Sequence, residues 1–180
     1  MAICTTWTSG VPKTCPGYGG TSRIWLATRS SVSVISPTVS TDATGIITSI
    51  TMGATPSFFY EFVPLKDSAF IDQNETKDPS KGTGPVWEQV VTIPLGKNET
   101  STRNAIKLLA KDDDVLCLEL NNNGTYWLYG EVRGLSMNSG GTKGGTLIND
   151  RNGWDVVLTG LELNPAREVQ VTNLAALINV

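Results

Sequence analysis

Short segments in which apolar and polar residues alternate, separated by turn-forming residues, dominate this sequence. Within residues 46–52, one set of side chains alternates with another: Ile46, Thr48, Ile50 and Met52 against Ile47, Ser49 and Thr51. A period of two residues is typical of a β-strand, whose successive side chains point to opposite faces of a sheet. Comparable signals lie at residues 23–28, 32–35, 58–65, 87–95, 115–120, 125–132, 154–160 and 168–173. The sequence therefore predicts a mainly β fold in a single domain spanning residues 1–180.

Two hairpins are predicted from the turns between these segments. Residues 115–120 and 125–132 are joined by Asn121-Asn-Asn-Gly124, and an Asn-Gly pair tolerates the positive φ that tight hairpin turns need. A longer hairpin is predicted over residues 58–95, with a flexible tip at residues 77–85 that is rich in Gly and Pro. The strands of this longer hairpin carry many polar residues, so we expect one side of it to meet water or a partner.

One helix is predicted, over residues 100–111. Its N-cap is expected to be Thr100 or Ser101, because hydroxyl side chains accept hydrogen bonds from the free N–H groups of a first helical turn. An apolar stripe that packs on a sheet is predicted from three residues at helical spacing, Ile106, Leu109 and Ala110. The acidic run at residues 112–114 has the wrong sign for the C-terminal end of the helix dipole, so we expect the helix to end there. As a calcium site this run lacks the alternating ligand spacing of a binding loop, and a solvated turn is expected.

Three further segments lack a strand or helix pattern. Residues 1–20 are rich in Gly, Pro, Thr and Cys and are expected to form an irregular arm, either loosely packed or ordered against a neighbouring subunit. The glycine-rich residues 139–145 are expected to form a mobile loop, because they lack the Gly-Lys-Ser/Thr ending of a phosphate-binding loop. The apolar residues 174–180 either close the core or cover a neighbour in an assembly.

The composition argues against most catalytic chemistry. Histidine is absent from the 180 residues, which excludes Ser–His and Cys–His nucleophilic sites and most zinc sites. An acid pair such as Asp112 with Glu119 has the residue types of a glycosidase, but their spacing alone is no evidence for one. We therefore expect no enzyme activity, no cofactor and no metal.

Charge and hydropathy bound the partners. Apolar residues make up 39% of the chain and charged residues 17%, which argues against both disorder and a membrane-spanning chain. The formal net charge is −3 and the basic residues are scattered, so we do not expect a nucleic-acid clamp. The first residues show no charged-then-apolar leader, and we expect synthesis in a cytoplasm.

The three cysteines, Cys4, Cys15 and Cys117, cannot all pair with one another. Cys4 and Cys15 flank a Gly-Val-Pro turn, and both a disulfide and two reduced thiols are possible there, with reduced thiols favoured by the odd count. Cys117 alternates with apolar neighbours in a strand pattern, so we expect it to be a small core residue.

A set of short motifs runs through most of the chain. They comprise Thr102-Arg-Asn104 with Leu108-Leu-Ala-Lys111, Gly124-Thr-Tyr-Trp-Leu-Tyr-Gly130, Gly134-Leu with Ser139-Gly-Gly, Asp150-Arg-Asn-Gly-Trp154, Val156-Val-Leu-Thr-Gly160 with Glu162, and the earlier Cys4, Cys15, Gly19-Gly20 and Ile24-Trp25. In these motifs the sequence resembles the tail tube proteins of bacteriophages, especially virion proteins of phages that infect Bacteroidetes-type hosts.

The resemblance implies a fold of two packed antiparallel sheets, sandwich- or barrel-like, flanked by one short helix at residues 100–111 and carrying a long hairpin at residues 58–95. It implies homo-hexameric rings that stack into the tube of a virion tail, are assembled in the host cytoplasm and contact other tail proteins. DNA would pass through the tube without specific binding, and no membrane is involved.

The resemblance also implies roles for particular residues. Acidic residues around the hairpin would line the lumen and repel passing DNA, with the candidates Glu61, Asp67, Asp72, Glu75 and Glu88. An ordinary solvated sheet face is the alternative for these acids. The N-terminal arm, the hairpin tip and residues 136–146 are candidates for ring-to-ring contacts, with the residues Cys4, Trp7, Lys77, Lys81, Ser139 and Lys143.

Two other interpretations remain open at this stage. A tail terminator, a connector or a baseplate hub component would show a similar pattern. A sugar-binding β-sandwich is a different class, which would use exposed Trp25, Trp127 or Trp154 as a stacking platform. A soluble monomer that binds oligosaccharide would support the second interpretation, whereas rings or tubes would support a tail protein.

Overall fold

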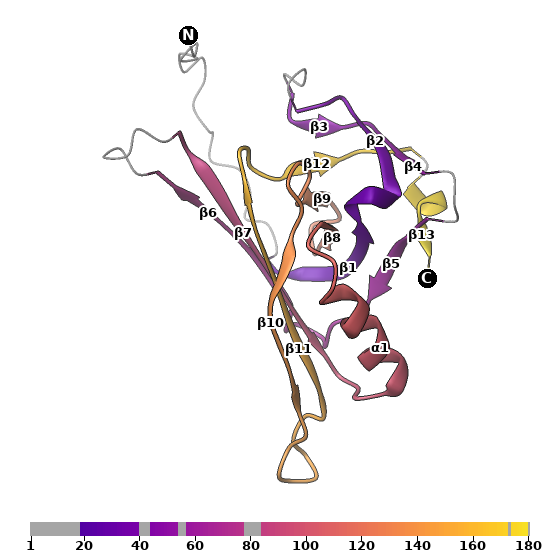
Figure 1. Ribbon diagram of the computed structural model, residues 1–180, viewed down its shortest axis with the longest axis vertical. Coiled ribbons are helices and arrows are strands. Elements are labelled where there is room, and N and C mark those ends of the chain that lie inside the picture. Colours follow the sequence, from indigo (N-terminus) through magenta and orange to yellow (C-terminus); the bar gives the residue numbers. More distant parts are fainter. Residues whose placement is uncertain (1–18, 40–43, 54–56, 78–83, 173, 180) are drawn as a thin grey trace.

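The structure is a computed structural model that describes residues 19–39, 44–53, 57–77, 84–172 and 174–179. In this part of the chain the strands form three sheets, and one α-helix accompanies them (Figure 1). We call the seven-stranded sheet the central sheet, the four-stranded sheet the long sheet and the two-stranded sheet the short sheet. The predicted mainly β fold, with packed sheets and one flanking helix, is confirmed.

The elements are ordered as follows across each sheet. The central sheet contains β13 (Ile178–Asn179), β5 (Phe59–Phe62), β1 (Thr21–Thr28), β8 (Val115–Asn121), β9 (Tyr126–Tyr129), β12 (Arg167–Val169) and β3 (Ile46–Ile47). The long sheet contains β10 (Ser136–Lys143), β11 (Gly153–Glu162), β7 (Val86–Leu95) and β6 (Phe70–Thr76). The short sheet contains β2 (Val32–Ser36) and β4 (Ser49–Met52). The helices within the described residues are α1 (Thr100–Leu109) and two 3-10 turns, η1 (Arg29–Ser31) and η3 (Leu174–Ala176).

The central sheet separates two hydrophobic cores. In its middle, β1 pairs with β8, so that Leu26 lies opposite Cys117 and Trp25 lies opposite Leu118. Alternation sends these two pairs to opposite faces of the sheet. The first core packs the Leu26 and Cys117 face against the long sheet and α1, through Val91, Ile93, Ile106, Leu109, Val156 and Leu158. The second core packs the Trp25 and Leu118 face against the short sheet, through Val32, Ile35 and Ile50. Cys117 is fully buried, as predicted.

The hairpin of β8 and β9 is confirmed with its predicted turn. The Asn121 side-chain Oδ1 accepts hydrogen bonds from the N–H groups of Asn123, at 3.0 Å, and Thr125, at 3.1 Å. Gly124 follows with a φ of +82°, which glycine adopts without a steric cost. β9 ends at Tyr129 rather than at Val132, because the chain turns at Gly130, where φ is +72°.

The predicted helix is confirmed, with different ends. Glu99 is the N-cap, with extended backbone angles, and its side chain makes no capping hydrogen bond. The proposed caps Thr100 and Ser101 already lie in the first turn of α1. Ile106 and Leu109 are buried, whereas the third residue of the predicted stripe, Ala110, is the exposed C-cap.

Three other predictions need correction. The predicted strand at residues 46–52 is broken at Thr48, whose N–H donates to the Ser36 carbonyl at 2.9 Å. The break places Ile47 and Ile50 in the same core, although strict alternation puts them on opposite faces. The long hairpin begins at Phe70 rather than at residue 58, because β5 pairs with β1 in the central sheet.

Residues 136–143 form a strand, β10, rather than a loop. β10 pairs with β11 from Ser136, opposite Thr159, to Lys143, opposite Gly153. The C-terminal segment closes the second core of its own chain: β13 pairs parallel with β5, and Leu174, Leu177 and Ile178 pack against the core.

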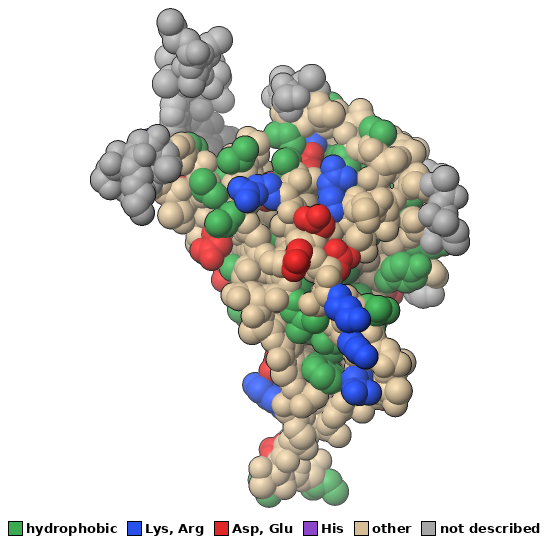
Figure 2. Space-filling model, in the orientation of Figure 1, with side chains coloured by type: hydrophobic (Ala, Val, Ile, Leu, Met, Phe, Trp, Pro, Cys, Tyr) green, Lys and Arg blue, Asp and Glu red, His purple; other side chains and the backbone are tan. Residues whose placement is uncertain are grey.

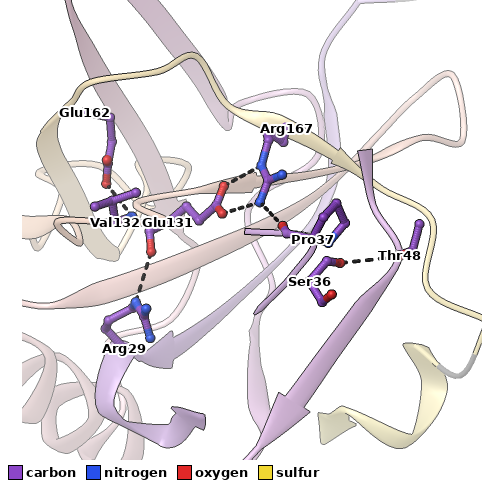
Figure 3. A network of polar contacts seen from close by, with 8 residues as sticks. All are labelled: Arg29, Ser36, Pro37, Thr48, Glu131, Val132, Glu162 and Arg167. Carbon is purple, nitrogen blue, oxygen red and sulfur yellow. Dashed lines mark hydrogen bonds and ion pairs between the residues drawn. The ribbon is translucent and has the colours of Figure 1, made fainter. Parts of the chain in front are cut away.

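A buried ion pair ties β12 to the turn that follows β9 (Figure 3). The Arg167 guanidinium donates to both carboxylate oxygens of Glu131, and its Nη2 also donates to the Pro37 carbonyl at 2.9 Å. The Glu131 backbone carbonyl accepts from Arg29 Nε at 3.0 Å. The Arg167 side chain is 6% exposed and that of Glu131 is 13% exposed, so solvent screens this pair only weakly.

Glu162, at the end of β11, holds the same turn from the other side (Figure 3). Its Oε1 accepts the N–H groups of Val132, at 3.1 Å, and Arg133, at 2.8 Å. Glu162 is 2% exposed, and this burial raises the pKa of its carboxyl above the ordinary value of 4.5. The hydrogen bonds from Val132 and Arg133 lower the pKa and so oppose the shift.

The raised pKa of Glu162 predicts that the stability of the fold depends on pH. Above its folded pKa the Glu162 carboxylate is charged in a site that favours the neutral form, so stability falls as pH rises through the interval between 4.5 and the folded pKa. We expect Glu162→Gln to be more stable than the wild type at pH 7, with a difference that shrinks as the pH falls through that interval. Urea unfolding of both proteins between pH 4 and 8 measures it. A difference that grows on acidification would contradict the assignment.

Candidate functional site

The long sheet has one face turned away from the first core, which we call the open face. Val91 and Ile93 of β7 face the core and lie opposite Leu158 and Val156 of β11, so the intervening residues of each strand point away from it. By register the open face comprises Phe70, Asp72 and Asn74 from β6, Glu88, Val90 and Thr92 from β7, Asp155, Val157, Thr159 and Leu161 from β11, and Ser136, Ser139, Gly141 and Lys143 from β10. It is a surface of mostly small or uncharged side chains.

The predicted lumen acids do not share one surface. Asp72 and Glu88 lie together on the open face, on neighbouring strands whose register places Asp72 opposite Val90 and Asn74 opposite Glu88. Glu75 lies opposite Trp87, and alternation points it to the other side of the sheet. Asp67 lies in the turn before β6, with a φ of +54°. The lumen role stays a prediction for Asp72 and Glu88 as a pair.

Glu61 belongs to β5 of the central sheet and is already paired. Its two carboxylate oxygens accept from Arg23 Nε and Nη2, at 2.5 and 2.7 Å. This hydrogen bonding raises the pKa of the Arg23 guanidinium, which lies 5.0 Å from the centre of the Trp25 ring. The Arg23 side chain is 44% exposed, so the pair stabilises the fold only weakly. Glu61 is thus a surface partner of Arg23 on a different sheet from Asp72 and Glu88.

The basic charge on the open face is offset by Asp155. This carboxylate pairs with Lys143 Nζ at 3.0 Å and with the Arg151 guanidinium. The Arg151 hydrogen bond is the main reason why the pKa of Asp155 is lowered. Asp72 and Glu88 have no comparable ion pair among the described residues, and Arg133 lines the same pocket as Glu88.

β10 and β6 are the two edges of the long sheet, within the described part of the chain. Every pairing in this sheet is antiparallel, so its four strands alternate in direction and the two edge strands run in opposite directions. Each edge leaves a row of backbone N–H and C=O groups for another strand. β6 carries the acids Asp72 and Glu75, whereas the charged residue of β10 is Lys143.

The predicted ring-to-ring contacts are only partly described. Ser139 and Lys143 lie on β10, at an edge of the long sheet and on its open face. Lys77 is exposed just after β6. Cys4, Trp7 and Lys81 lie outside the described residues, as do the Cys4–Cys15 question, most of the N-terminal arm and most of the hairpin tip at residues 77–85.

Of the three tryptophans considered for a sugar platform, Trp25, Trp127 or Trp154, the structure excludes Trp25. Trp25 is 1% exposed, within the second core, and its ring centroid lies 6.1 Å from that of Tyr126. Trp127 and Trp154 are half-buried on different sheets. The indole N–H of Trp127 donates to Thr125 Oγ1 at 3.2 Å, and that of Trp154 donates to Asn98 Oδ1 at 3.1 Å. A platform that includes Trp25 is excluded by its burial.

Asp112 and Glu119, the acid pair considered for catalysis, have different hydrogen-bond partners in the fold. Glu119 is buried and accepts hydrogen bonds from Thr21 Oγ1, at 2.6 Å, and Tyr129 Oη, at 3.0 Å. Burial and the neighbouring Glu119 raise the pKa of the Tyr129 hydroxyl, which remains a donor at all ordinary pH. Asp112 instead accepts the Asp114 N–H at 3.1 Å in the turn after α1. Among the described residues no cluster of acidic or cysteine side chains is arranged to hold a metal ion.

Sequence reasoning missed one feature of this site, the edge strand β10. Its residues Ser-Met-Asn-Ser-Gly-Gly-Thr-Lys contain one large apolar side chain, so no alternation of apolar residues reveals the strand. No local pattern in this segment distinguishes the strand from a loop.

No helix in the described ranges has the length and apolar character that a bilayer span requires. Comparison with known proteins gives no match to a family model, to a curated protein or to a solved structure.

Proposed function

We propose that this chain is a structural subunit of a phage tail tube, which forms homo-hexameric rings that stack into a conduit for DNA in the virion. The observation that carries the proposal is the long sheet, which among the described residues has two unpaired edges and a face that neither core covers. Together with the motif resemblance, this arrangement favours an assembly in which the long sheets of neighbouring copies join edge to edge. The rings would be assembled in the host cytoplasm and contact other tail proteins.

The strand directions are compatible with a closed ring. A copy generated by rotation about an axis roughly along the strands keeps its strand directions, so its β10 meets β6 of the neighbour antiparallel. A head-to-tail joint of this kind closes when the rotation closes. Asp72 and Glu75 make the β6 edge acidic, whereas β10 carries no acidic residue, which favours this pairing over β6 with β6.

The charge of the open face suits a passage for DNA. In a ring joined through these edges, the open face or the core side must line the channel, and the core side is covered by the central sheet and α1. Asp72 and Glu88 would then repeat around the lumen, while Lys143 is paired with Asp155. Negative charge repels the phosphate backbone, whose binding depends on lysine and arginine. DNA would therefore pass without specific binding.

The first test of this proposal is the state of the purified protein. We expect negative-stain electron microscopy to show rings or tubes, and mass photometry to show a species of six subunits. A protein that stays monomeric at high concentration would refute the proposal. Oligosaccharide binding by that monomer, measured on a glycan array, would favour the sugar-binding alternative.

Introducing a charge at Ser139 on β10 tests the proposed joint between β10 and β6. Ser139 is exposed on the open face of this edge strand, and the opposing edge carries Asp72. We expect Ser139→Glu to weaken each joint by up to about fivefold, because like charges on neighbouring strands cost roughly 0.2–1 kcal/mol, whereas Ser139→Lys should assemble at least as well as the wild type. Mass photometry over a concentration series measures both.

Two controls accompany the Ser139→Glu variant. High salt should restore assembly of Ser139→Glu by screening the exposed charges, and Asp72→Lys should rescue it by restoring opposite signs. Equal assembly by the glutamate and lysine variants would show that β10 does not meet an acidic edge.

A further inference from the structure

The hairpin of β10 and β11 ends in an exposed apolar tip. Leu147 is 67% exposed and Ile148 is fully exposed, although both are strongly apolar. The hairpin extends beyond the body of the molecule (Figure 1), and the space-filling view shows hydrophobic side chains at its end (Figure 2). Two such residues at the end of a projecting ribbon are unfavourable in water unless another surface covers them.

The tip is held in shape by its own hydrogen bonds. Asp150 Oδ2 accepts the N–H groups of Thr146, at 2.7 Å, and Leu147, at 2.8 Å. These two bonds lower the pKa of the Asp150 carboxyl. Asp150 is the one charged residue between Lys143 and Arg151, and its carboxylate already accepts hydrogen bonds from the backbone of the tip. Covering Leu147 and Ile148 therefore does not leave this carboxylate unpaired.

The same chain carries an apolar groove on another surface. A cavity of about 960 Å³ lies between α1 and the segment that contains β5 and the residues after it. Its lining includes three exposed apolar side chains, namely Tyr60, Val63 and Leu108, which are 50%, 67% and 69% exposed. This volume is at the upper end of the range of small-molecule sites, and it is large enough for two aliphatic side chains.

The charges at the groove do not oppose an apolar guest. Glu61 forms an ion pair with Arg23, and Lys97 Nζ lies 3.5 Å from Glu99 Oε1. Asp112 accepts a hydrogen bond from its own turn. Leu147 and Ile148 are not among the residues that line the groove of their own chain, so a tip that enters such a groove belongs to another copy.

We propose that the tip formed by Leu147 and Ile148 inserts into the groove between α1 and β5 of a second copy of this chain. A projecting apolar plug and a matching socket on different surfaces of one molecule make a head-to-tail contact, which propagates from copy to copy. The contact uses neither edge of the long sheet. It goes beyond the proposed function, because it joins copies whether or not the long sheets close into rings.

Photo-crosslinking tests this contact directly. Ile148 is replaced by p-benzoylphenylalanine in the full-length chain, and isotopically light and heavy protein are mixed before irradiation. We expect mixed light–heavy crosslinks from position 148 to residues 58–65 or to α1. Crosslinks only within one chain, crosslinks to other surfaces, or no crosslinks at any concentration would each overturn the proposal. A small apolar molecule retained in the groove, detected by native mass spectrometry, would overturn it as well.

Matched variants measure the strength of the contact. We expect Leu147→Ser with Ile148→Ser to weaken association at least about a hundredfold, from the lost burial of two aliphatic side chains. Leu108→Glu, on the exposed side of α1, should do the same from the socket side. The control is Val132→Ser with Leu163→Ser, which removes two apolar residues that are 50% and 59% exposed and lie outside both tip and groove. An equal effect of the control would overturn the assignment.

The two proposals fail separately. If tubes never form but position 148 crosslinks to the groove, the tail tube function is wrong and this contact stands. If Ser139→Glu weakens ring assembly while the crosslink persists, the two joints are distinct. If rings form and the crosslink is absent, the ring proposal stands and the inserted tip is wrong.

Discussion

Arg167→Ala is expected to lower the free energy of unfolding by about 3–5 kcal/mol, because it leaves a buried carboxylate without its partner. Arg167 donates to both oxygens of Glu131 and to the Pro37 carbonyl. Removing the guanidinium takes away every one of these bonds and leaves Glu131, whose side chain is 13% exposed, in a site of low dielectric. Guanidinium chloride unfolding followed by circular dichroism measures the loss.

Two controls separate a buried charge from a general loss of packing. Arg167→Met combined with Glu131→Leu replaces both charges by apolar groups and should recover most of the stability. Arg23→Ala removes a similar bidentate pair with Glu61, but the Arg23 side chain is 44% exposed, so we expect a loss of less than about 1 kcal/mol. A cost for Arg167→Ala as small as that for Arg23→Ala would show that the pair is solvated.

Local patterns predict the elements of this fold well where the side chains themselves carry the periodicity. In β7, Val91, Ile93 and Leu95 pack in the first core, as the alternation predicts, and the Asn-Gly turn specifies the hairpin of β8 and β9 from its own backbone angles. In α1, Ile106 and Leu109 form the buried stripe that helical spacing predicts. Each of these signals depends on residues that are near one another in sequence.

The pairing of strands could not be read in the same way. β5 and β6 are neighbours in sequence, yet β5 pairs with β1 in the central sheet while β6 pairs with β7. Which partner wins depends on contacts between residues far apart in the chain, and a local pattern contains no information on them. The break at Thr48 has the same origin, because its N–H is taken by Ser36 of β2.

The sequence placed Asp72 and Glu88 correctly on one hairpin but grouped Glu61 with them wrongly, because it does not show which strands pair. Asp72 and Glu88 lie on one face because their strands pair in the register that a hairpin imposes. Glu61 was grouped with them on the assumption that its strand belongs to the same hairpin, and the Arg23 pair across β1 and β5 was not visible from sequence. The edge strand β10 lacks large side chains, so the strand was hidden, whereas the exposed Leu147 and Ile148 stand out as an apolar pair in a polar segment.

Trp25→Ala is the second large expected effect, a loss of about 3–5 kcal/mol of unfolding free energy. Trp25 lies in the middle of the central sheet, opposite Leu118 on β8 and Glu61 on β5. It is among the largest fully buried side chains of the described residues. Truncation would leave a cavity between the central and short sheets, which the surrounding strands can fill only partly because their backbone pairing holds them apart. Thermal unfolding followed by calorimetry measures the loss.

The same variant distinguishes the core role of Trp25 from a sugar-binding role. The Trp25 indole N–H has no acceptor within the described structure, so Trp25→Phe should keep most of the packing without breaking a hydrogen bond and should cost clearly less than Trp25→Ala. A tryptophan that stacks on sugar would behave otherwise: Trp25→Ala would leave the unfolding temperature nearly unchanged and abolish glycan binding. Because the residue is 1% exposed, we expect the stability loss instead, and a normal unfolding temperature for Trp25→Ala would contradict the position of this side chain in the second core.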